Sequence, residues 1–336
     1  MHRDPFTLEP LEPGEAEAVD RVVDRMKAMM AQEWAGSTMR RDAHSKSHGA
    51  MKAEFTIERD LPPELRVGLF ATPATYRAWV RCSNSKNTIR PDGKRDVRGL
   101  AIKLMGVPGR KLLAGNEDES TQDFIFVSTD QFPVRDVAGF DALAAAFLGD
   151  YIDKAIYFST HLDVSWRLFK AFRRFANPLQ IRYFSCTPYA FGSGQVKYCL
   201  TPKPGTRDPM PFDPPENALR VAAVAQLARG DAQFDFCVQF RTDADAMPLE
   251  DPTVPWPEKD SPFRKVATLR ILPQTFDTDA RNAIGEALSF SPWHCLPDHM
   301  PLGGLNRARR VIYERLSAYR HDANHVPRRE PTDWEA

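Results

Sequence analysis

Hydrophobic residues recur at three- and four-residue spacing near the start of the chain, over residues 15–33. The apolar positions that share this spacing are Ala18, Val22, Val23, Met26, Met29 and Met30. Such spacing places side chains on one face of a helix. The pattern therefore predicts an amphipathic helix at the start of the chain, packed over a sheet.

Short runs of alternating or continuous apolar residues predict β-strands in two groups. The first group comprises residues 50–57, 78–82, 99–105 and 124–128, and the second comprises 181–185, 194–200, 234–242 and 265–272. Segments rich in Gly, Pro, Asn and Asp separate the runs, as is typical of loops between strands. Together these segments predict a β-rich core.

Helical spacing returns between the two groups of strands, over residues 137–175. The apolar side chains that this segment offers to cover one side of the β core are Phe140, Leu143, Phe147, Ile152, Ile156, Trp166, Phe169 and Phe172. A short helix is predicted over 217–229 and a last helix over 305–319. Because strands and helices do not alternate strictly, the order indicates an α+β fold around a mostly antiparallel sheet or barrel.

The predicted elements divide the chain into three parts. Residues 1–35 form an N-terminal helical segment, 36–322 the main domain, and 323–336 a C-terminal tail. The tail, which ends in VPRREPTDWEA, is expected to be loosely ordered.

Composition changes this picture mainly by exclusion. The 336 residues include 45 basic and 45 acidic ones, so the formal net charge of zero predicts no broad basic surface for nucleic acid or anionic lipid. The first twenty residues lack the apolar run of a secretory signal, and no segment reaches membrane-spanning length. Five scattered cysteines without a C-x-x-C pair argue against a disulfide framework. These features predict a soluble, cytoplasmic protein.

Arg309 and Tyr313 lie four residues apart on the predicted last helix, so their side chains share one face. A fixed guanidinium favours the ionised form of a neighbouring phenol, and a phenolate can bind ferric haem. Arg315 and Tyr319 have the same spacing. The spacing alone is weak evidence for a ligand, because such pairs most often only pack against each other.

His44 precedes the first predicted strand and is a candidate for proton transfer. A neutral imidazole over a bound peroxide can take a proton from one oxygen and return it to the other, which assists O–O cleavage. A hydrogen-bonded loop histidine is the commoner role. A zinc hydrolase would instead use His44 and His48, with His294, Cys295 and His299 as distant candidates, although no zinc-protease spacing is present.

Short motifs occur along the chain in the order found in catalases. They are Arg41-x-x-His44-x-Lys46-x-x-Gly49-Ala50, Val80-Arg81-Cys82-Ser83, the run from Arg95 to Lys103, Gln122-Asp123-Phe124, Val134-Arg135-Asp136, Val196-Lys197-Tyr198, Pro248-Leu249-x-x-Pro252, Val254-Pro255-Trp256-Pro257, Phe290-Ser291-Pro292 and Arg309-x-x-x-Tyr313. Their shared order over residues 35–320 is hard to obtain by chance. The sequence resembles the catalase superfamily, and within it the small catalase-related haem peroxidases. This resemblance implies an antiparallel β-barrel of catalase type that binds haem b and is flanked by helices.

The resemblance implies a role for each matching residue around the haem iron. Tyr313 is similar to the proximal iron ligand and Arg309 to its charge partner, and the distance from residues 290–292 favours Tyr313 over Tyr319. His44 resembles the distal acid–base group. Ser83 matches the serine that orients this histidine.

Further matches concern the porphyrin and the distal pocket. Arg41 and Arg81 match arginines that pair with haem propionates, as fixed cations facing carboxylates should. Phe140 resembles an aromatic residue packed against a distal pyrrole, although ordinary core packing is an equally good interpretation. Ser128 stands where catalases have a distal asparagine, so a second hydrogen bond to bound peroxide would be shorter or absent.

The departures from the catalase pattern shape the functional expectation. Besides Ser128, we expect the chain to lack the C-terminal helical region and the long N-terminal arm of full catalases. We therefore expect a haem-dependent peroxidase that reduces organic or hydrogen peroxides with a small reducing co-substrate and has weak catalase activity. The alternatives are a fatty-acid hydroperoxide isomerase or dehydratase, like the allene-oxide-forming members, and a non-catalytic haem-binding protein. The physiological hydroperoxide, the donor and the formation of a homo-oligomer stay open.

Overall fold

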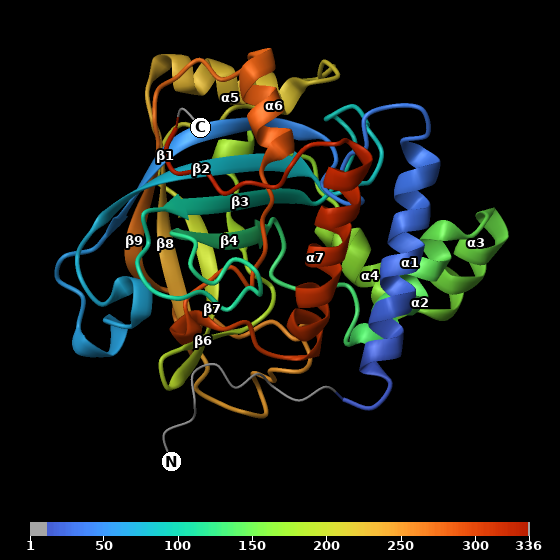
Figure 1. Ribbon diagram of the computed structural model, residues 1–336, viewed down its shortest axis with the longest axis horizontal. Coiled ribbons are helices and arrows are strands. Elements are labelled where there is room, and N and C mark those ends of the chain that lie inside the picture. The colour runs from blue at the N-terminus through green and yellow to red at the C-terminus, as the bar shows by residue number, and fades with distance from the viewer. Residues whose placement is uncertain (1–11, 335–336) are drawn as a thin grey trace.

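The strands form one antiparallel sheet that closes on itself (Figure 1). The computed structural model describes residues 12–334, and its strands are β1 (Ser47–Ile57), β2 (Thr75–Asn84), β3 (Arg98–Met105), β4 (Thr121–Val127), β5 (Tyr183–Phe184), β6 (Tyr189–Phe191), β7 (Gly194–Pro202), β8 (Ala232–Phe240) and β9 (Arg264–Ile271). Their order is β5-β4-β3-β2-β1-β9-β8-β7-β6, and β5 also pairs with β7. This additional pairing closes eight strands into a barrel and leaves β6 attached to β7. The expected α+β fold with an antiparallel barrel is confirmed.

Aromatic side chains fill the interior of the barrel. The ring of Phe236 lies 5.1 Å from that of Phe55, 4.9 Å from that of Phe124 and 5.4 Å from that of Tyr198, measured between centroids. All four residues are fully or almost fully buried. The barrel is therefore a packed core, and the candidate site has to lie outside it.

The first helix packs on other helices and not on the sheet. The helices are α1 (Glu15–Glu33), α2 (Val137–Leu148), α3 (Tyr151–Thr160), α4 (Leu162–Ala171), α5 (Ala218–Arg229), α6 (Asp279–Ala287) and α7 (Gly304–Ala323). The apolar face of α1 was predicted correctly, but Val22 and Val23 pack with Leu305 and Ile312 of α7. Figure 1 shows α7 between α1 and the barrel, so the prediction that α1 covers the sheet is wrong.

The helical insertion also differs from the expectation. Residues 137–175 break into α2, α3 and α4, with Asp136 and Asp150 capping the first two helices. Inner side chains such as Leu143 form a small cluster of their own. The apolar residues Ile152, Ile156, Trp166 and Phe169 are exposed and do not cover the β core. Short helices that pack on one another and on α1 leave their outer faces uncovered, which residue spacing cannot reveal.

Two further segments depart from the sequence prediction. Helix α6, which was not predicted, begins after Thr278, whose side chain accepts a hydrogen bond from the backbone N–H of Arg281, and it packs on β1. The tail is packed and not loose: the Trp334 indole donates to the Ala78 carbonyl over 3.0 Å, and Glu330 reaches a buried lysine of β3. The expectations for residues 1–11 and 335–336 lie outside the described residues. No helix within 12–334 is long and apolar enough to cross a membrane.

Candidate functional site

A cavity of about 960 Å³ lies between the barrel, α1, α2 and α7. Seven of the eight predicted site residues line it: Arg41, His44, Arg81, Ser83, Phe140, Arg309 and Tyr313. They come from the loop before β1, from β2, from α2 and from α7, which are far apart in sequence. The tertiary fold therefore brings together residues that the sequence only placed in order.

The α7 side of the cavity carries an arginine–phenol pair. Arg309 Nη2 donates to the Tyr313 hydroxyl oxygen over 3.1 Å, and Arg309 Nη1 donates to Asn306 Oδ1 over 3.0 Å and Thr187 Oγ1 over 3.1 Å. Burial alone would lower the pKa of Arg309, but the phenol oxygens of Tyr313 and Tyr189 outweigh it, so the pKa is raised above its usual value. A permanently charged guanidinium is thus fixed against the Tyr313 oxygen, where it stabilises negative charge.

The second tyrosine considered from the sequence points elsewhere. Tyr319 packs with the helix cluster that includes α1, where Lys27 lies 5.6 Å from the centre of its ring. Arg315 pairs with Asp20. Tyr319 does not belong to the cavity lining, so of the two tyrosines the fold offers Tyr313 to a ligand in the cavity.

His44 contacts Ser83 on the barrel side of the cavity. His44 Nδ1 and Ser83 Oγ are 3.0 Å apart, and the carbonyl of His44 accepts a hydrogen bond from Arg81 Nη2 over 2.9 Å. Burial, together with the charges of Arg81, Arg41 and Arg309, lowers the pKa of His44 to about 3. The imidazole is therefore neutral at physiological pH, and one of its nitrogens can accept a proton.

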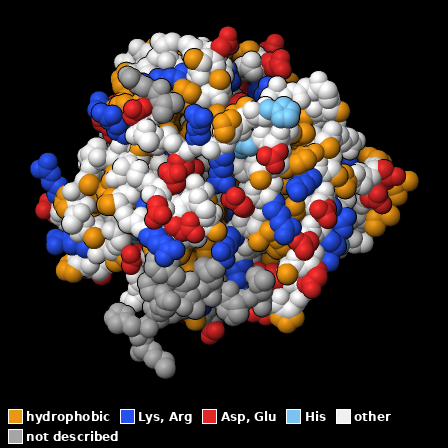
Figure 2. Space-filling view, viewed as in Figure 1, with side chains coloured by type: hydrophobic (Ala, Val, Ile, Leu, Met, Phe, Trp, Pro, Cys, Tyr) orange, Lys and Arg blue, Asp and Glu red, His pale blue; other side chains and the backbone are white. Residues whose placement is uncertain are grey.

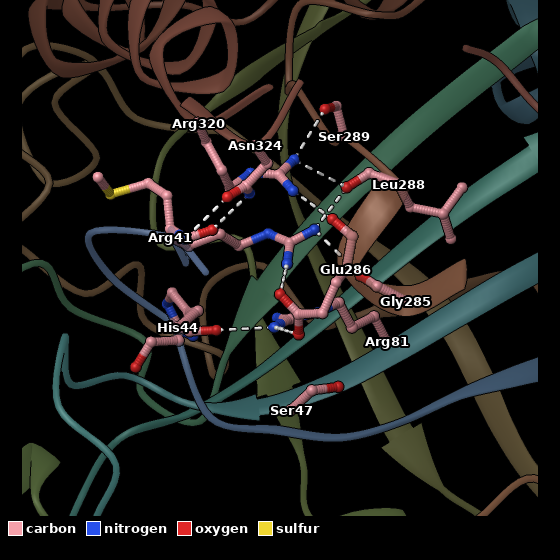
Figure 3. A network of polar contacts seen from close by, with 12 residues as sticks. Arg41, His44, Ser47, Arg81, Gly285, Glu286, Leu288, Ser289, Arg320 and Asn324 are labelled. Atoms are coloured by element: carbon pink, nitrogen blue, oxygen red, sulfur yellow. Dashed lines mark hydrogen bonds and ion pairs between the residues drawn. The ribbon is translucent and has the colours of Figure 1, made fainter. Parts of the chain in front are cut away.

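Three arginines gather around Glu286 beside this histidine, and two of them pair with its carboxylate (Figure 3). Glu286 of α6 lies 3.1 Å from Arg41 Nη1 and 3.6 Å from Arg81 Nη2. Arg320 of α7 donates to the backbone carbonyl of Glu286 and to Ser289 Oγ. Burial and the mutual repulsion of the guanidiniums lower the pKa values of Arg81 and Arg320. The guanidiniums therefore outnumber the carboxylates at this end of the cavity.

This charge excess fits the haem group that the sequence resemblance implies. A porphyrin with two propionates carries two carboxylates, which guanidiniums can pair with, and Arg81 Nε is buried without a hydrogen-bond partner among the described residues. The rest of the lining includes apolar side chains such as Leu305, Ile312 and Phe140, which suit a flat aromatic ring system. The residues present therefore fit haem.

Ser128 is the predicted site residue that the structure does not bring to the cavity. Its hydroxyl accepts a hydrogen bond from the backbone N–H of Arg98 over 2.9 Å. Its neighbours Val127 and Thr129 line the cavity, because alternate side chains of an extended segment lie on the same side. Thr129 is the hydroxyl on the cavity side that the sequence analysis missed.

Two more residues of the site were missed. Arg320 lies on the same face of α7 as Arg309, Tyr313 and Ser317, all of which line the cavity, and helical spacing from Tyr313 could have found it. Glu286 had no signal of this kind, since α6 itself was not predicted.

The zinc alternative finds no support in the structure. Among residues 12–334 no group of three or more His, Cys, Asp or Glu side chains is arranged to hold a metal ion. His48 Nε2 is 2.8 Å from Asn84 Oδ1 in a separate buried network, and His299 Nε2 accepts from the backbone N–H of Leu69 over 3.0 Å. His44 and His48, the two histidines near β1, therefore have different partners and do not form a metal pair.

Comparison with known proteins identifies the architecture. No known protein family matches the sequence, and no curated protein is similar to it. Two solved structures are similar: a bacterial catalase with a TM-score of 0.66 and 18% identity, covering 88% of this chain and 61% of that one, and a fungal catalase with a TM-score of 0.66 and 17% identity, covering 95% and 66%. The chain has the catalase fold. It spans less than two thirds of the length of either catalase.

Proposed function

We propose that this protein binds haem b in the cavity and acts as a peroxidase on organic hydroperoxides and hydrogen peroxide. The observation that carries the proposal is that one cavity is faced both by a phenol paired with a buried arginine and by a neutral imidazole. The catalase fold of the chain agrees with an oxidoreductase. A protein that needed only a stable core would require neither the phenol–arginine pair nor the neutral imidazole at this cavity.

Side chains from α7, α2, β2 and the loop before β1 would hold the cofactor. Tyr313 would bind the iron through its phenol oxygen, with Arg309 stabilising the negative charge there. Arg41, Arg81 and Arg320 would pair with the propionates, and Phe140 would pack against the porphyrin. Bound haem would supply the redox chemistry and the binding of peroxide oxygen that side chains alone cannot provide.

His44 would move the proton. One ring nitrogen is at hydrogen-bond distance from Ser83 Oγ, which fixes the orientation of the ring. The other nitrogen, Nε2, would take the proton of the hydroperoxide and return it to the leaving oxygen as the O–O bond breaks, so that an alcohol or water departs. Ser83 acts on the peroxide only through His44 and is a positioning residue.

Rearrangement of a fatty-acid hydroperoxide is a second candidate at the same site. The outer part of the cavity is lined by Phe147, Leu168 and Phe172, which suit a long apolar chain. Incubation of haem-loaded protein with a lipid hydroperoxide separates the two functions. A peroxidase yields the alcohol only when an electron donor is present, whereas an isomerase or dehydratase consumes the hydroperoxide without a donor.

The proposal is tested by replacing the ligand. Wild-type protein loaded with hemin should show the visible spectrum of a high-spin ferric phenolate complex, and Tyr313→Phe should lose it because the phenol oxygen is gone. Tyr319→Phe is the matched control and should keep the spectrum, since Tyr319 does not line the cavity. A wild-type chain that stays colourless with hemin, or a Tyr313→Phe spectrum identical to that of the wild type, would overturn the proposal.

A further inference from the structure

The outer face of α3 and α4 exposes an unusual number of large apolar side chains. They are Tyr151, Ile152, Ile156, Leu162, Trp166 and Phe169, each with more than half of its surface accessible, and we call them the apolar face. In α4 the last three follow helical spacing, and the rings of Trp166 and Phe169 stack at 5.8 Å. Contiguous exposed apolar surface of this kind marks an interaction site. In Figure 2 hydrophobic side chains appear at the edge of the molecule where Figure 1 places α3.

Basic side chains accompany the apolar face. Residues 147–175 include five basic and three acidic side chains. The carboxylates are engaged locally, because Asp150 and Asp153 form the capping box of α3 and Asp163 pairs with Arg167. Arg95 lies 4.8 Å from the Phe169 ring centre and Lys170 lies 5.9 Å from that of Trp166. The net charge of zero over the whole chain thus hides a local positive excess at these helices.

The apolar face adjoins the cavity of the candidate site. Phe147, at the end of α2, lines the cavity and is also 37% exposed. Lys154 of α3 and Leu168 of α4 line the same cavity from helices that carry the apolar face. The Lys86 ammonium lies 5.1 Å from the Phe147 ring centre and 4.7 Å from that of Phe172. A molecule bound against the apolar face would therefore lie close to the side of the cavity that Phe147, Lys154 and Leu168 line.

We propose that the apolar face docks on the surface of a lipid bilayer that contains anionic lipids. Trp and Tyr rings are favoured at the boundary of headgroups and acyl chains, and neighbouring Lys and Arg side chains bind anionic headgroups. A second copy of the chain fits less well, because Lys170 and Arg95 beside the apolar face, and the exposed Arg174 just after α4, would then meet the same positive charges on the copy. The inference goes beyond the proposed peroxidase activity and does not need haem, but it names the membrane as the source of the hydroperoxide.

Sedimentation of the full chain with vesicles tests the docking. Binding should be strong to vesicles of equal parts phosphatidylcholine and phosphatidylglycerol, weak to phosphatidylcholine alone, and reduced by salt. Trp166→Ser combined with Phe169→Ser should lower the partition coefficient about tenfold or more, since the bilayer would no longer bury these two aromatic rings. The control Val221→Ser, which removes an exposed apolar side chain from α5, should leave it unchanged. Circular dichroism shows that each variant is folded.

The charges have a separate test. Lys170→Gln with Arg174→Gln should reduce binding to the anionic vesicles by about tenfold and leave the weak binding to phosphatidylcholine unaltered. None of the four replaced residues lines the cavity, so the haem spectrum and the turnover of a water-soluble hydroperoxide should match the wild type. Equal vesicle binding by all variants would overturn the proposal. So would a wild type that ignores vesicles but self-associates in a manner that Trp166→Ser abolishes, which would identify the apolar face as a contact between copies.

Discussion

His44 combines a lowered pKa with a backbone conformation that few histidines adopt. Its φ of 59° lies in the left-handed region, and its N–H and carbonyl are both held, by Ser85 and Arg81. Non-glycine residues persist in this conformation where the surrounding contacts enforce it, and such positions cluster at functional sites. Burial and the surrounding arginines lower the pKa of the ring and keep it neutral. His44 thus combines a fixed backbone with a neutral ring, as an acid–base group requires.

The pH profile should report this lowered pKa. A proton acceptor must be neutral, so the peroxidase rate of haem-loaded protein should show no inflection near 6.5 and should fall only as the pH approaches about 3. His44→Ala should keep the haem spectrum and lose about a hundredfold or more in rate. Steady-state assays in buffers of constant ionic strength measure both. An inflection near 6.5 that disappears in His44→Ala would contradict a lowered pKa, and undiminished turnover in that variant would remove His44 from the mechanism.

At the scale of elements, the pairing of β2 with β3 shapes the pocket around the imidazole. Gly99 of β3 is the register partner of Ser83 of β2. A Cβ atom at Gly99 would lie 2.5 Å from the His44 ring and 3.0 Å from Ser83 Oγ. The absence of a side chain on one strand therefore makes room for the histidine that the neighbouring strand orients.

Gly99→Ala should displace the imidazole without removing any chemical group of the site. We expect the peroxidase rate to fall by about a hundredfold, because a shift of about 1 Å in a reacting group is that costly. The phenolate spectrum should persist, since Tyr313 lies on α7. Gly205→Ala is the control, as a Cβ there meets no atom within 4 Å. Full activity of Gly99→Ala would show that the position of His44 tolerates the added methyl group, and loss of the haem spectrum would show a disturbance that extends beyond the imidazole.

At the scale of the whole molecule, the C-terminal tail is tied to the barrel through buried charge. Lys103 Nζ of β3 lies 2.7 Å from Asp123 and 2.6 Å from Glu330, and the side chains of all three are almost completely buried. Burial alone would lower the pKa of Lys103, but the two carboxylates outweigh it and raise the pKa. Glu330 also accepts a hydrogen bond from Thr121 Oγ1 over 2.8 Å, so removing its charge weakens two buried hydrogen bonds, which costs more than losing a surface pair.

Glu330→Gln should therefore lower the free energy of unfolding by about 1–3 kcal/mol. Glu314→Gln removes the half-exposed partner of Arg328 and should cost less than about 1 kcal/mol. Urea denaturation of the haem-loaded proteins measures both. The pKa of Glu330 is lowered from 4.5, so its contribution is present above that pH and is lost as the pH falls through the lowered value. Equal stability of the two variants at neutral pH would contradict a role for the tail in holding the fold together.

Residue spacing and motif order predicted a large part of the fold and of the site. The bounds of α1 and the positions of β1, β3 and β9 follow from periodicity, because local alternation records which side chains are buried. The order of motifs singled out seven residues that line the cavity. Glu286 escaped because α6 was not predicted. Ser128 was chosen because it stands where catalases have an asparagine. The alternation of side chains along the extended segment instead places Thr129 at the cavity.

What the sequence by itself determined is local: which segments are helices and strands, and which residue types stand in the order of a haem site. Contacts between distant segments were decided only by the tertiary structure. Closure of the barrel depends on two residue pairs between β5 and β7, and the placement of Tyr313 in the cavity, which motif spacing already favoured, depends on how α7 is turned against α1. Whether the apolar residues of α3 and α4 are covered is likewise a matter of what packs on them. Periodicity reports that a face is apolar, and only three-dimensional packing decides whether that face meets the core or the solvent.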